Sequence, residues 1–89
     1  MRAIVTVVGK DRVGIIASVC ALLSGCGINI LDISQTVLQG YFTMVMMVDL
    51  TGSEKSFSEV SESLKAEGEE TGLVIRIQRE DIFEAMHRI

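Results

Sequence analysis

The residues of this sequence that could take part in chemistry gather around a short turn between two glycines. The segment Gly9-Lys-Asp-Arg-Val-Gly14 follows an apolar, β-branched run and precedes an apolar run with helical spacing. A phosphate-binding loop has the same glycine spacing, but it continues with Lys and then Ser or Thr, where this chain has Ile15 and Ile16. The turn therefore does not indicate a nucleotide site.

No group of residues indicates catalysis or metal binding. The single histidine, His87, lies close to the C-terminus, and no serine or cysteine has an evident base beside it in the pattern. Cys20 and Cys26 point to different sides of a predicted helix, which argues against a disulfide. One histidine and two separated thiols do not complete a zinc site. We therefore expect a non-catalytic protein without a metal or another cofactor.

Binding of a small molecule fits the turn better. The first N–H groups of a helix are free and lie at the positive end of its dipole, which suits a carboxylate. Gly14 has no side chain to block the approach, and Asn29 begins a strand that we expect to be hydrogen-bonded beside the first strand. Its amide carries both a donor and an acceptor. The pattern favours binding of a small zwitterion. The alternative is that Gly14 only permits close packing and Asn29 only satisfies the end of a strand.

The surrounding elements alternate in a regular order. Strands are expected at residues 3–8, 28–38, 41–50 and 73–78. Helices are expected at residues 15–26 and from a capping box at Ser56 to a stop within residues 68–72. Gln39-Gly40 predicts a hairpin turn. The broken alternation near Ile30 indicates either a bulge or a strand with both faces partly covered.

Right-handed crossovers then place both helices on one face of the sheet. The predicted fold is α+β, a ferredoxin-like βαββαβ sandwich with a four-stranded antiparallel sheet. Residues 1–80 form the domain. We expect residues 81–89 to form a helical tail capped by Asp81.

Composition limits the partners. The chain has 89 residues, 48% of them hydrophobic, and a net charge of −4, which argues against binding to a nucleic-acid backbone. Residues 13–31 carry no charge, but Gly25 and Gly27 interrupt this run, so we expect no membrane span. No signal peptide is evident, and free cysteines favour the cytoplasm. An apolar sheet face without helices predicts a homo-oligomer, with a homodimer as the expected form.

Two segments taken together resemble a known family. G-K-D-R-V-G-I-I-A-S-V followed by G-C-G-I-N-I-L-D-I-S-Q is similar to the ACT domain, an amino-acid-sensing module of metabolic enzymes and regulators. The chain most resembles small stand-alone ACT proteins and the ACT modules of the glycine-cleavage-system transcriptional repressor type. The resemblance implies that copies associate and that an amino acid binds between the first loop of one subunit and its neighbour. Carried over to this chain, the implied ligand contacts are Asp11, Arg12, Val13, Gly14, Ile15, Asn29 and Ile30.

Two functions follow as hypotheses. The first is a regulatory ACT protein that binds an amino acid or similar metabolite at a subunit interface and signals to a protein partner of unknown identity. The alternative is a protein–protein interaction module with no small-molecule ligand. The sequence does not name the ligand, because serine-sensing members of the family carry an amide at the position of Asp11.

Overall fold

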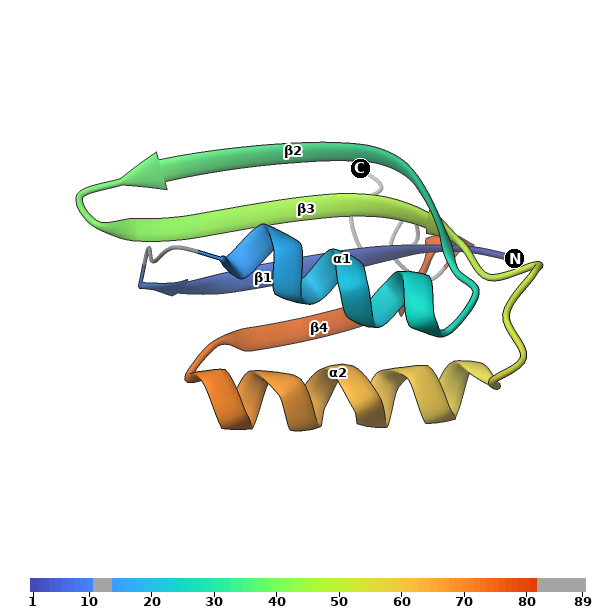
Figure 1. Ribbon diagram of the computed structural model, residues 1–89. Helices are drawn as coiled ribbons and strands as arrows, with labels where there is room; N and C mark the ends of the chain where they lie inside the picture. Colours follow the sequence, from blue (N-terminus) through green and yellow to red (C-terminus); the bar gives the residue numbers. More distant parts are fainter. Residues whose placement is uncertain (11–13, 82–89) are drawn as a thin grey trace.

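The fold is a single sheet covered by two helices on one face. The computed structural model describes residues 1–10 and 14–81. Its elements are β1 (Arg2–Lys10), α1 (Ile15–Gly25), β2 (Asn29–Leu38), β3 (Tyr41–Asp49), α2 (Phe57–Thr71) and β4 (Val74–Arg79). Figure 1 shows both helices on the same side of the antiparallel sheet. The predicted βαββαβ ferredoxin-like fold is confirmed. The predicted tail helix, which includes His87, lies outside the described residues except for its first position, Asp81.

The order of the strands differs from one expectation. The sheet runs β2-β3-β1-β4, so β2 pairs with β3 and not with β1. The expectation that the strand of Asn29 is hydrogen-bonded beside the first strand was wrong. The reason is the hairpin turn at Gln39 and Gly40, whose φ angles of 50° and 82° confirm the predicted turn. This short turn makes β2 and β3 neighbours, and β3 occupies the place beside β1. Strands β2 and β4 therefore form the two open edges.

The core lies between the sheet and the helices. Its members are mainly aliphatic and alternate along each strand: Ala3, Val5 and Val7 of β1, Phe42, Met44, Met46 and Val48 of β3, and Ile75 and Ile77 of β4. The helices cover this core with five buried side chains: Ile15, Val19 and Leu23 of α1, and Val60 and Leu64 of α2. Met44 and Met46 have no exposed surface, so these two methionines pack the core.

Helix α2 begins and ends where the sequence predicted. The Ser56 hydroxyl accepts from the Glu59 N–H, and the Glu59 carboxylate accepts from the Ser56 N–H, which completes the capping box. These bonds from Ser56 hold the pKa of Glu59 below its usual value. The end predicted between Gly68 and Gly72 is confirmed, because the helix continues to Thr71 and Gly72 caps it with a φ of 76°.

The capping box gives the first testable prediction. Ser56→Ala removes the acceptor for the Glu59 N–H, and we expect the free energy of unfolding to fall by about 1 kcal/mol. Urea unfolding followed by circular dichroism measures this change. Ser58→Ala is the matched control, since Ser58 is an exposed serine inside the first turn with no side-chain hydrogen bond in the described part of the chain. An equal loss in both variants would contradict the role of the box.

A bulge gives β2 an exposed apolar side. The register shifts between Ile30 and Asp32, which confirms the predicted bulge and places the extra residue at Leu31. After the bulge, Ile33 and Val37 lie opposite Met46 and Phe42, on the face that carries the helices. They remain 40% and 54% exposed, because β2 lies at the edge of the sheet beyond α1 (Figure 1).

The face without helices carries both apolar and polar side chains. On this face Ile4, Val8, Val45, Met47 and Val74 alternate with polar residues, among them Ser34, Thr36, Thr6, Thr43 and Arg76. Five of the exposed large hydrophobic side chains lie on β2 and its hairpin: Leu31, Ile33, Val37, Leu38 and Tyr41. By register, Leu38 and Tyr41 lie on the face without helices. The β2 edge therefore offers an apolar surface suited to self-association.

Candidate functional site

The N-terminus of α1 presents accessible backbone N–H groups. Gly14 occupies the N-cap position with φ 90° and ψ 0°, and no side chain caps it. The first turn of α1 carries no acidic residue, and the first helical bond runs from the Ser18 N–H to the Gly14 carbonyl at 2.9 Å. A Cβ atom added at Gly14 would meet no described atom within 4 Å. A carboxylate can therefore approach the N–H groups that precede Ser18.

The other predicted contact residues divide into three groups. Asp11, Arg12 and Val13 lie outside the described residues. Ile15 is buried in the core, and Ile30 is half-buried against it, so these two offer only backbone groups to a ligand. Asn29 is exposed, and its amide makes no hydrogen bond with the described residues. The available polar groups are thus the N-terminus of α1 and the Asn29 amide.

Within one chain these two groups lie at opposite ends of the sheet. Gly14 follows the end of β1, where Lys10 pairs with Tyr41. Asn29 pairs with Asp49, which pairs with Arg2 at the start of β1. Helix α1 runs between these ends over 11 residues, or about 16 Å. The expectation that the turn and Asn29 converge is therefore wrong for a single chain.

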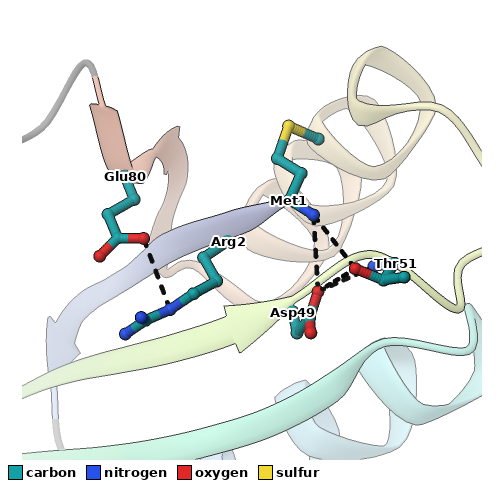
Figure 2. A network of polar contacts seen from close by, with 5 residues as sticks. All are labelled: Met1, Arg2, Asp49, Thr51 and Glu80. Carbon is teal, nitrogen blue, oxygen red and sulfur yellow. Dashed lines mark hydrogen bonds and ion pairs between the residues drawn. The ribbon is translucent and has the colours of Figure 1, made fainter.

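Polar contacts fix the end of the sheet that carries Asn29 (Figure 2). The N-terminal ammonium of Met1 lies 3.1 Å from the Thr51 hydroxyl and 3.6 Å from the Asp49 carboxylate. Thr51 donates to Asp49 from its hydroxyl at 2.6 Å and from its N–H at 2.9 Å. These two bonds hold the pKa of Asp49 below its usual value. Beside them Arg2 pairs with Glu80 at 3.4 Å. The Asp49 carboxylate is thus engaged, whereas the exposed Asn29 amide makes no hydrogen bond with the described residues.

Residues 1–10 and 14–81 do not indicate a metal site or a membrane span. No group of three His, Cys, Asp or Glu side chains in these ranges could hold a metal ion. No helix there is long and apolar enough to span a bilayer. Cys20 and Cys26 are free thiols. Ile16 in the first turn of α1 is 37% exposed and so adds to the apolar surface of the molecule.

These observations define the class of protein: a small ferredoxin-like domain with a four-stranded antiparallel sheet and two helices. The match to the ACT domain family covers residues 2–78, and the chain belongs to this family. It is 53% identical over 89 residues to a UPF0237 protein of Listeria innocua, with 100% of both chains covered.

Two solved structures support the assignment. An ACT domain protein from Streptococcus pneumoniae is 44% identical, with a TM-score of 0.83 and 94% of each chain covered. A candidate glycine cleavage system transcriptional repressor is 28% identical, with a TM-score of 0.76, and the match covers 86% of this chain and 44% of that one. Both the resemblance to ACT domains and the similarity to the repressor type are confirmed.

Proposed function

We propose that this chain is a regulatory ACT protein that acts as a homodimer in the cytoplasm. It binds an amino acid or a similar small carboxylate between two copies and passes this state to a protein partner. The observation that carries the proposal is the separation of two free polar groups in one chain. The α1 N-terminus and the Asn29 amide both suit a zwitterion, yet they lie at opposite ends of the sheet.

A second copy paired along β2 brings these groups together. Antiparallel pairing of two β2 strands about a two-fold axis reverses the direction of the second sheet. Asn29 of the partner subunit then lies at the end of the sheet where the first copy has Gly14. The site is completed by two copies, and each dimer holds two such sites.

The side chains of β2 suit this pairing. In a pairing centred on Gln35, Ile33 of one copy lies opposite Val37 of the partner subunit, and apolar cross-strand pairs are stabilising. Asp32 is the only charged residue of β2, so no like charges meet. The β4 edge, in contrast, carries Arg76 and Arg79. The composition of the two edges favours β2 for self-association.

The chemistry of the site follows from its two parts. The backbone N–H groups at the start of α1 donate to the ligand carboxylate, and the helix dipole favours its negative charge. The side-chain oxygen of Asn29 from the partner subunit accepts from the ligand ammonium, while its NH₂ group can donate to the carboxylate. Support for a regulatory role comes from the similarity to the candidate transcriptional repressor.

Thermal unfolding of dialysed protein with a panel of common amino acids tests the ligand. A ligand at a hundred times its dissociation constant adds about 2.7 kcal/mol when it binds only the folded form. In a domain of this size we expect the unfolding midpoint to rise by roughly ten degrees. Gly14→Asp should abolish the rise, because its carboxylate lies where the ligand carboxylate binds.

Gly14→Asn is the matched control for this experiment. Gly14 has a positive φ, and Asn and Asp both tolerate this conformation better than other non-glycine residues do. The two variants therefore differ mainly in charge, and we expect Gly14→Asn to keep part of the rise. A panel in which no amino acid changes the midpoint would contradict ligand binding and would favour the interaction module without a ligand.

A further inference from the structure

The second open edge of the sheet forms a groove that the ligand site does not use. Ser61, Lys65 and Glu69 of α2 and residues 73–78 line a groove of about 430 Å³ between that helix and the outer side of β4. On an edge strand alternate residues direct their backbone N–H and C=O groups outward, where they can pair with an added strand. β4 has six residues, enough to pair with one short extended segment.

Positive side chains flank the middle of this groove from both faces. Lys65 lies on α2, which covers one face of the sheet, whereas Arg76 lies opposite Thr6 and so belongs to the other face. Neither cation forms an ion pair within the described residues, in contrast to Arg79, which pairs with Asp81 at 3.0 Å. The lining also contains one carboxylate, Glu69. The groove therefore carries a net positive charge on a chain whose net charge is −4.

The positive charge of the groove disfavours a second copy of this chain and favours an acidic partner. Two-fold antiparallel pairing of β4 with a second copy places each basic edge against the same basic edge, and a pairing centred on Arg76 puts two guanidinium groups opposite each other. Like charges in that position are destabilising. In an added strand, successive residues point to opposite faces of the sheet. An acidic residue on one face then meets Lys65, and an acidic neighbour on the other face meets Arg76.

We infer that the β4 edge binds an extended, acidic segment of a partner protein by strand addition. The backbone of the segment pairs with β4, and its adjacent acidic side chains pair with Lys65 and Arg76. The two edges of the sheet thus have different roles, with β2 taking a second copy and β4 taking a partner. This inference stands independently of the amino-acid site, because it uses neither Gly14 nor Asn29.

A synthetic peptide tests the inference on the full chain. The probe has about seven residues, with a central Asp-Glu pair flanked by threonine and valine. The comparison peptide has Lys-Lys at the centre. Titration of ¹⁵N-labelled protein follows the backbone amide resonances without any amino-acid ligand present. We expect the acidic peptide to shift the amides of β4 and of the facing turns of α2, to leave those of β2 unchanged, and to bind more tightly than the basic peptide.

Charge reversal separates the ion pairs from strand addition itself. Lys65→Glu and Arg76→Glu should each weaken the acidic peptide by roughly three- to tenfold, and the double variant should prefer the basic peptide. Lys55→Glu makes the same change in net charge at an exposed position outside the groove and should leave binding unchanged. Equal binding of the two peptides, shifts on β2, no shifts at millimolar peptide, or a change of subunit number in Arg76→Glu would each overturn the inference.

Discussion

Mixing two variants that each fail to bind the ligand should restore binding. Gly14→Asp blocks the α1 N-terminus, and Asn29→Leu removes the amide while keeping a similar volume at an exposed position. In a mixed dimer, the Asn29→Leu copy contributes an intact Gly14, and the Gly14→Asp copy contributes an intact Asn29. One of its two sites is therefore complete, while the other carries both changes.

The expected amount of binding follows from random association of the copies. Half of the dimers in an equal mixture are mixed, so about a quarter of the wild-type sites are restored. The ligand that stabilises the wild-type protein in the amino-acid panel is the probe, and titration calorimetry after unfolding and refolding the mixture together measures the number of sites. Each variant refolded alone should show none. A mixture that also shows none, with normal subunit exchange, would contradict a site shared between two copies.

Gly68→Ala should destabilise the fold even though alanine is the better helix former. Gly68 lies inside α2, where alanine is favoured over glycine by about 1 kcal/mol. However, the added Cβ would lie 2.6 Å from the Leu73 carbonyl oxygen, and this oxygen belongs to the backbone that leads into β4. The helix and the strand would have to move apart. We expect a net loss of about 1–3 kcal/mol in the free energy of unfolding.

Gly25→Ala provides the control with the opposite sign. Gly25 is the last residue of α1, its φ is not positive, and an added Cβ meets nothing within 4 Å. Here the propensity term acts alone, and we expect the stability to stay unchanged or to rise by up to about 1 kcal/mol. Urea unfolding of the two variants compares them directly. A stabilised Gly68→Ala variant would show that α2 and β4 can separate at little cost.

The sequence predicted well those features that depend on a few neighbouring residues. The Ser56–Glu59 capping box, the Gln39–Gly40 turn and the bulge next to Ile30 each involve atoms that are close along the chain. The alternation of buried residues in β3 is similarly local, since the pleat fixes which side chains share a face. The order of these elements, with the handedness of the crossovers, was then sufficient for the fold.

The candidate site could be predicted only in part. The glycine at the start of α1 was recognisable, because an uncapped helix N-terminus is a local feature. The position of Asn29 relative to Gly14 was not, because it depends on which strand pairs with β2. The basic groove was also missed. Its signals were weak: Arg76 is a single charge in an apolar run, and Lys65 lies on a helix face with many other charges.

The sequence by itself determined the helices, the strands, their order and the accessible glycine at the start of α1. Only the tertiary structure decided that a Cβ atom at residue 68 would contact the Leu73 carbonyl oxygen too closely. It also decided that Ile33 and Val37 remain exposed at an edge. Finally, it placed Gly14 and Asn29 at opposite ends of the sheet. The physical reason is the range of the interactions. Hydrogen bonds and propensities within one element are encoded by adjacent residues, whereas close approach, burial and strand neighbours arise between segments that are distant in the chain.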